Sequence, residues 1–180
     1  MKSQALAALT MVLLSSCAPN VDEKLISYFG APDENVSEAR KAAEICLKNS
    51  FQQREPTFRL SGYVDAMFEN PERDIEEIRG TVLIQPNSGV VVQLGEDGKG
   101  SSGCIVGLKG MSPRQSHDLA LPWVRHFNGV SNEERGQGLT PNAIQVWRGV
   151  SPRSRLQVFI VAYKTWDILE VPGAAIRLSQ

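Results

Sequence analysis

The stretch GTVLIQPNSGVVVQL, residues 80–94, decides the fold class, because it contains two apolar, β-branched runs separated by a turn signal. Residues 81–85 and 90–94 are rich in Val, Leu and Ile, which are enriched in strands. The letters PNSG at 86–89 are residue types that form tight turns. The stretch therefore predicts two antiparallel strands joined by a short loop.

Further strands are expected on the C-terminal side of this hairpin. Residues 103–108, 143–148 and 155–163 are short apolar runs, and residues 174–178 follow a Pro-Gly pair as an edge strand. With the hairpin, these runs predict an antiparallel sheet of about five or six strands.

Two main helices are predicted to cover that sheet. In the first, apolar side chains recur at helical spacing over residues 36–50, after Asn35 as cap with Glu38 as its reciprocal partner. The second begins at Ser112, where Pro113 and Gln115 complete a capping box, and ends at residues 128–129. The predicted fold class is α+β, a two-layer domain over residues 35–180 whose sheet is covered on one face by the helices.

The N-terminus has the layout of a secretory signal. Lys2 provides a positive start, and residues 5–14 form an apolar run that is too short to span a bilayer, which takes about 20 residues. The run ends in Leu14-Ser15-Ser16-Cys17, an aliphatic residue, two small residues and a cysteine.

These four residues resemble the lipobox of bacterial lipoproteins. The resemblance implies that residues 1–16 are a signal peptide, that cleavage occurs before Cys17, and that lipid on Cys17 anchors the chain to a membrane. Residues 17–34 would then be a lipidated tether with a short helix at 21–29. Ala18 after the cysteine favours sorting to the outer membrane, facing the periplasm.

Export also bears on the two remaining cysteines. Cys46 lies on the apolar stripe of the first helix and Cys104 on the strand at 103–108. In an oxidising compartment such thiols tend to pair, so we expect a Cys46–Cys104 disulfide, with two separate buried thiols as the alternative. The layout also resembles secreted bacterial proteins that carry one cysteine on a first helix and another on a later strand, a resemblance that implies no activity.

Composition excludes several partners. The formal net charge is −1, so no basic surplus favours nucleic acid. Residues 98–103 match the G-x-G-x-x-G pattern of dinucleotide sites, but a strand is expected after them where phosphate binding needs a helix N-terminus. We therefore expect no nucleotide, no nucleic acid and no cofactor.

No local catalytic or metal site is predicted. Ser116, His117 and Asp118 are the residue types of a hydrolase triad, but consecutive helical residues point about 100° apart. His117 and His126 fall on nearly opposite faces of one helix, and no paired-cysteine or His-Glu-x-x-His motif occurs.

Trp147 and Trp166 are the candidates for a partner surface, if both lie on the open sheet face; ordinary core packing is the alternative. By strand alternation, one of Val146 and Trp147 should be exposed. The functional hypothesis is a membrane-anchored envelope lipoprotein with a non-enzymatic binding or assembly role and an envelope protein as partner. The alternative is a cell-envelope hydrolase whose site is assembled from residues distant in sequence.

Overall fold

The structure is a computed structural model that describes residues 30–66, 80–96, 101–133, 142–152, 154–165 and 170–179. The expected signal peptide, Cys17, the helix expected at 21–29 and Trp166 lie outside the described residues.

Within the described ranges the chain forms three helices and eight strands. The helices are α2 (Asp33–Lys48), α3 (Phe51–Leu60) and α4 (Pro113–His126). The strands are β1 (Val64–Asp65), β2 (Gly80–Ile84), β3 (Val90–Glu96), β4 (Ser102–Leu108), β5 (Val130–Glu133), β6 (Ala143–Val150), β7 (Gln157–Tyr163) and β8 (Gly173–Ser179). The α+β class is as predicted, but the sheet has eight strands instead of five or six, because β1 and β5 are short and were not recognised.

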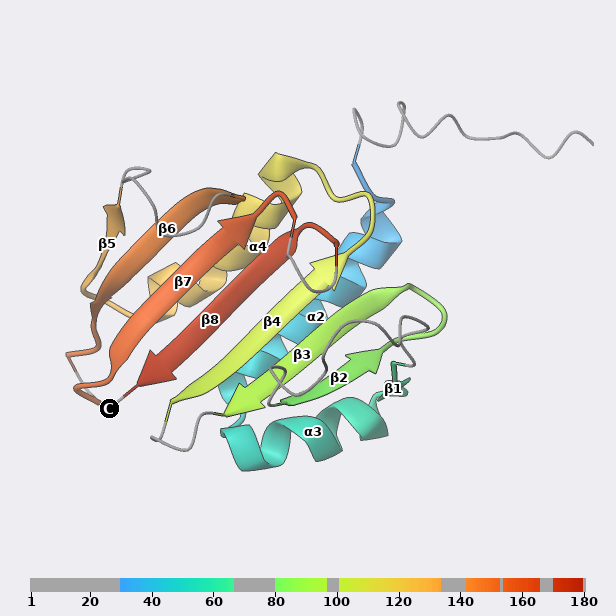
Figure 1. The fold of residues 1–180 in the computed structure, drawn as a ribbon, viewed down its shortest axis with the longest axis horizontal. Helices are drawn as coiled ribbons and strands as arrows, with labels where there is room; N and C mark the ends of the chain where they lie inside the picture. Colours follow the sequence, from blue (N-terminus) through green and yellow to red (C-terminus); the bar gives the residue numbers. More distant parts are fainter. Residues whose placement is uncertain are drawn as a thin grey trace, which may run out of the picture.

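All eight strands belong to one antiparallel sheet in the order β1-β2-β3-β4-β8-β7-β6-β5. The chain therefore builds two meanders, β1–β4 and β5–β8, each of which follows a helix (Figure 1). The meanders join where β4 pairs with β8 over six residues, from Ser102↔Leu178 to Gly107↔Gly173.

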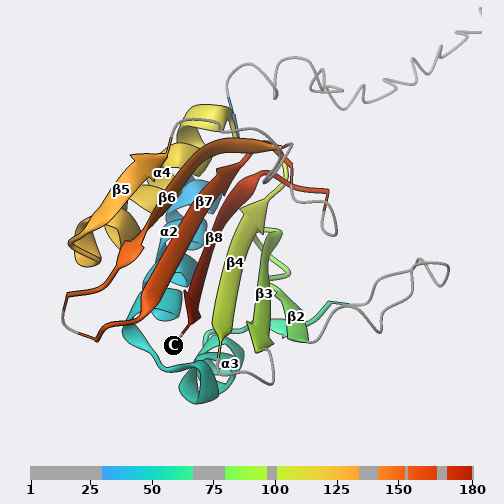
Figure 2. The same cartoon turned by 60° about the vertical axis from the view of Figure 1, so that its left-hand side comes forward.

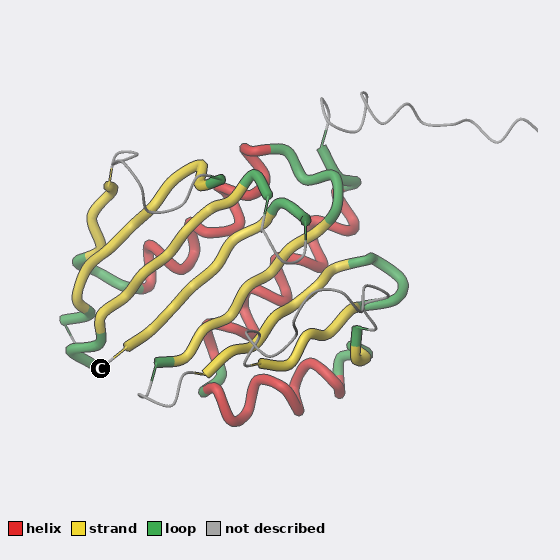
Figure 3. Tube along the Cα trace, viewed as in Figure 1, coloured by secondary structure: helices red, strands yellow, loops and turns green. Residues whose placement is uncertain are grey.

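Helices α2 and α4 lie on the same face of the sheet, which we call the covered face (Figures 1 and 2). The trace in Figure 3 shows the two helices behind the strands, with α3 at the end of the sheet nearest β1 to β3. α4 contacts β6, β7 and β8, while α2 contacts β3 and β4. The opposite side of the sheet, which the helices do not cover, is called the open face.

The main core lies between the helices and the covered face. Its fully buried large side chains are Trp123 and Leu119 from α4, Phe58 from α3 and, from the sheet, Leu83, Val90, Val92, Leu94, Val106 and Ile160. Alternate residues of a strand point to the same face of the sheet, and residues paired across strands share a face. Leu83, Val92 and Val106 are paired in this way across β2, β3 and β4. The hairpin predicted over residues 80–94 is present as β2 and β3, which pair antiparallel from Gly80↔Gly95 to Ile84↔Val91.

The capping box predicted for α4 is present. The Ser112 hydroxyl accepts a hydrogen bond from the Gln115 backbone N–H at 3.2 Å, and Gln115 Oε1 accepts from the Ser112 N–H at 2.8 Å. The same Gln115 side chain bonds both backbone groups of Ala31, at 3.0 and 2.9 Å. It therefore joins the start of α4 to the segment that precedes α2.

The cap predicted for the first helix was wrong. α2 begins at Asp33 after Pro32, and no side chain caps its N-terminus. Proline fixes φ in the helical range, and Asp33 and Glu34 place negative charge at the positive end of the helix dipole. These residues start the helix before Asn35 is reached.

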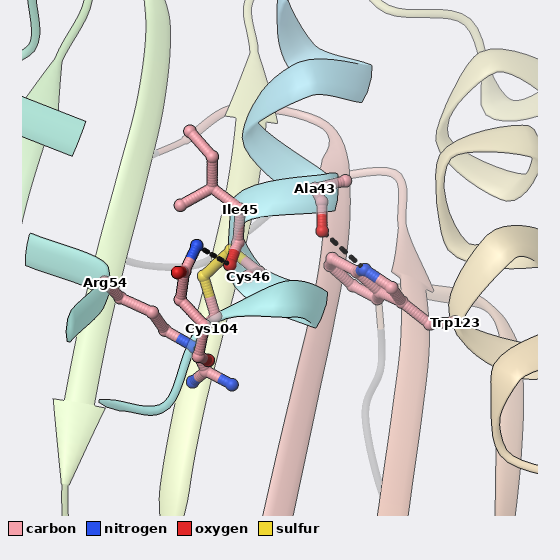
Figure 4. Close-up of a disulfide and its surroundings, with 7 residues drawn as sticks. Ala43, Ile45, Cys46, Arg54, Cys104 and Trp123 are labelled. Carbon is pink, nitrogen blue, oxygen red and sulfur yellow. Dashed lines mark hydrogen bonds between the residues drawn. A yellow bond between two sulfur atoms is a disulfide. The ribbon is translucent and has the colours of Figure 1, made fainter. Parts of the chain in front are cut away.

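The expected disulfide is present and links α2 to β4 (Figure 4). Cys46 and Cys104 are both fully buried, and their Cα atoms are 6.0 Å apart. On the other side of α2, the Trp123 indole N–H donates to the Ala43 carbonyl at 2.9 Å, which ties α4 to α2. The disulfide thus fixes α2 to the sheet, and the Trp123 hydrogen bond fixes α4 to α2.

Arg54 closes the C-terminal end of α2. Its Nε donates to the Asn49 carbonyl at 3.0 Å, and only 4% of the residue is exposed. Burial lowers the pKa of the guanidinium from its ordinary value. Asn49 itself donates from its side chain to the Ile45 carbonyl at 3.2 Å. A cation at this end of the helix compensates the negative pole of its dipole.

Removal of the disulfide should destabilise the domain substantially. The cross-link spans 58 residues, for which the chain-entropy relation gives about 4 kcal/mol. We expect both the reduced wild-type chain and a Cys46→Ala/Cys104→Ala variant to unfold at much lower denaturant concentration than the oxidised chain. Equilibrium unfolding in urea measures this; equal midpoints for oxidised and reduced wild type would contradict it.

Gly173 should be required at the β4–β8 junction. A Cβ at Gly173 would lie 2.8 Å from Gly107 Cα, against backbone that cannot move independently. Gly173→Ala should therefore cost about 1–3 kcal/mol of unfolding free energy, since overpacked sites force backbone shifts. Gly103→Ala is the matched control on the same strand pair, because its nearest contact would be at 3.7 Å. Equal unfolding free energies for the two variants would refute the packing argument.

Candidate ligand-binding site

Trp147 does not form the expected partner surface. It is 5% exposed and belongs to the main core on the covered face. Its ring lies 5.5 Å from that of His117 on α4. Strand alternation predicted that one of Val146 and Trp147 would be exposed. This prediction was wrong, because Val146 is also buried, with 9% of the residue exposed. The other candidate for that surface, Trp166, lies outside the described residues.

The Ser116-His117-Asp118 sequence does not form a triad. Ser116 is fully buried, and its hydroxyl has no hydrogen-bond partner among the described residues. His117 Nδ1 does approach Asp118 Oδ1, at 3.4 Å, so two of the three side chains meet although their helical directions differ. Ser116 points into the core instead, because it occupies the inner face of α4 with Leu119 and Ala120.

Other sequence candidates also remain separate. The His126 ring packs edge-on against the Phe127 ring, with 4.8 Å between the ring centroids. The described residues contain no group of three or more metal-ligating side chains. β4 begins at Ser102, so the glycine motif leads into a strand as expected. None of the helices within the described ranges is long and apolar enough to cross a membrane.

The open face carries its own apolar cluster. Ala143, Val146, Val161, Tyr163 and Ala175 are buried there, and Ile105 and Phe159 pack against them. This cluster is centred on β6 to β8, the strands whose other face holds α4. Phe159 stands at its margin and is only half-buried.

Beyond Phe159, the open face is hollowed by a groove of about 560 Å³. Two rows of cross-strand neighbours form it. The first row is Arg148↔Phe159↔Arg177. The second row lies two residues further along each strand, on the same face, and is Val150↔Gln157↔Ser179. The backbone of Gly149 and Val158 completes the lining. We call this hollow the arginine groove.

The described residues that line the arginine groove are partly basic and partly apolar. The Arg148 guanidinium lies over the Phe159 ring, 4.8 Å from its centroid, a cation–π contact that orients the side chain. Arg177 donates from Nη2 to the Ser101 hydroxyl at 3.4 Å. Of the described residues that line the groove, two are arginines and none is acidic. Val150, 54% exposed, supplies an accessible apolar edge.

Sequence reasoning missed this site for a reason that is visible in the chain. Arg148 and Arg177 each interrupt an apolar strand, which is an unusual place for a charge. Their convergence depends on the register of three strands, and only the structure gives that register.

The fold and groove define a class: an α+β domain with a half-covered antiparallel sheet and a basic groove on its open face. No protein-family model, curated protein or solved structure matches the chain.

Proposed function

We propose that the chain is a lipid-anchored, non-enzymatic binding protein of the bacterial cell envelope. Lipid on Cys17 would hold it at the outer membrane, facing the periplasm, and the arginine groove would bind another envelope component. The sequence Leu14 to Cys17 supports the anchor through its resemblance to a lipobox. Stable membrane attachment takes at least two acyl chains. The diacylglyceryl group that the lipobox resemblance implies for Cys17 would supply them.

The observation that carries the binding role is the arginine groove itself. Its volume of about 560 Å³ falls in the range of small-ligand sites, roughly 300–1,000 Å³. It joins an apolar margin to a few polar groups, which is the usual composition of such sites. A rigid sheet supplies all of the described lining residues, so their spacing is set before a ligand arrives.

The hydrolase alternative has less support. The residues that suggested it lie on α4, which packs on the covered face, whereas the groove lies on the open face. A ligand in the groove is therefore separated from His117 by the sheet. Ser116, the nearest nucleophile in sequence, is buried in the core.

A photo-reactive residue placed at the groove should capture the bound component in intact cells. We expect a p-benzoylphenylalanine at Val150 to form a discrete adduct, detected by mass spectrometry of the purified chain. Gln157, which is exposed in the groove, offers an occluding variant. Gln157→Trp should reduce the Val150 adduct, since the indole would fill the space.

Leu60 is the matched control for this experiment, because it is 90% exposed and lies on α3, toward the opposite end of the sheet. The same photo-reactive residue at Leu60 should not give the adduct. Identical adducts from both positions, or no adduct from Val150, would contradict binding at the groove.

Membrane attachment is tested separately. Cys17→Ala should move the protein from the membrane fraction to the soluble fraction, because it removes the only proposed acylation site. Ser16→Ala serves as control, since it keeps a small residue before the cysteine and should leave the protein in the membrane. Fractionation followed by immunoblotting reads both; unchanged partitioning of Cys17→Ala would end the lipoprotein proposal.

A further inference from the structure

The turn that joins α4 to β5 contains Asn128 followed by Gly129, and both residues are exposed. A hydrogen bond from the Val130 N–H to the Phe127 carbonyl closes the turn at 3.3 Å. Gly129 has a φ of 104°, a conformation that glycine adopts readily and residues with a Cβ rarely adopt. The Asn-Gly pair thus lies in a defined turn that is open to water.

The two reactive groups of this turn are not engaged elsewhere. Among the described residues, neither the Asn128 side-chain amide nor the Gly129 N–H has a hydrogen-bond partner. Gly129 has no Cβ, so nothing on that residue shields its nitrogen from the Asn128 Cγ. A bond between that nitrogen and that carbon closes a succinimide ring, which is the first step of asparagine deamidation.

Two asparagines of α2 and its C-terminal end lack this combination. The Val36 N–H, which follows Asn35, donates to the Pro32 carbonyl at 3.0 Å. The Asn49 side chain donates to the Ile45 carbonyl at 3.2 Å. In each case a hydrogen bond holds one of the two groups that would have to react.

The main chain of the turn packs closely against β6. Val130 pairs with Gly149, and a Cβ built on Gly149 would lie 2.7 Å from the Val130 Cα and would also collide with the Gly129 carbonyl oxygen. The turn therefore has no room to expand toward β6. Isoaspartate carries the main chain through its side-chain carbons and lengthens it by one carbon, about 1.5 Å. A longer turn moves β5 along or away from β6, because the turn fixes their register.

We propose that Asn128 is a site of spontaneous deamidation, and that isoaspartate at this position displaces β5 from its register with β6. The Gly129 nitrogen attacks the Asn128 Cγ, a C–N bond forms, and the side-chain amide nitrogen leaves as ammonia with the proton of the Gly129 N–H. Water then opens the succinimide at either carbonyl, giving aspartate or isoaspartate. One water is consumed and one ammonia released, and no other reactant takes part.

Peptide mapping of the ageing wild-type chain by mass spectrometry tests the modification. The full chain, kept in a nonionic detergent at mildly alkaline pH, is compared over time with the same chain unfolded in urea. We expect Asn128 to convert in the folded chain at a rate within about threefold of that in the unfolded chain, because no structure has to open first. Asn35 should convert only in the unfolded chain, since the amide that follows it is bonded at the start of α2.

Asn87 is the matched control within the same sample, because it is also exposed and also lies in a turn. Ser88 follows it, and the Cβ of that serine hinders approach to its nitrogen, so Asn87 should convert roughly tenfold or more slowly than Asn128 in the folded chain. Equal rates at the two positions would overturn the proposal. Conversion of Asn128 in urea but not in the folded chain would overturn it as well.

Hydrogen exchange of the separated products measures the effect on β5. The isoaspartate form should exchange the amides of β5 at least about tenfold faster than the fresh chain, because its pairing with β6 opens more often. Asn128→Asp adds the same charge without a longer main chain and should exchange like the wild type. Asn128→Gln, which would have to close a larger ring, should stay unmodified on ageing. Equal exchange by the isoaspartate form and Asn128→Asp would overturn the displacement of β5.

Discussion

The pairing of β4 with β8 is the interaction on which the rest of the structure depends. It joins two halves of the same plan, each a helix followed by a four-stranded meander. Unpaired, each half would expose a long apolar strand edge, which is a site of aggregation. Gly107 and Gly173 allow the close approach at one end of this junction, and Cys104, opposite Ile176, connects it to α2 through the disulfide.

This junction also determines where a binding site can form. Because α2 and α4 both pack on the covered face, the open face is closed, among the described residues, by side chains of the sheet itself. Small and apolar residues do so over the centre of β6 to β8, whereas the ends of these strands carry arginine, glutamine and serine. The arginine groove lies at that transition from apolar to polar, on a sheet held rigid by the α4 contacts behind it.

Local signals in the sequence predicted a large part of the fold. The turn at 86–89 and the capping box at Ser112 act within a few residues, so their outcome does not depend on distant contacts. α3 was missed because Pro56 and many polar residues obscure its period. β5 was missed because it is short and polar and gains its structure from pairing with β6. The arginine groove could not be predicted for the same reason: its rows exist only once the strands are in register.

The register of β6 shows how closely the core and the groove are connected. A bulge between Ala143 and Gln145 sets two residues of β6 against one of β7. In a regular strand Trp147 would share the open face with Ala143, and Arg148 would face the core. The bulge reverses this, so that Trp147 packs beside His117 and Arg148 enters the groove. Since a one-residue slip would bury the arginine and expose the tryptophan, burial of Trp147 is what holds Arg148 over Phe159. The tryptophan that the sequence suggested as a contact for partners therefore serves the groove from the opposite side of the sheet.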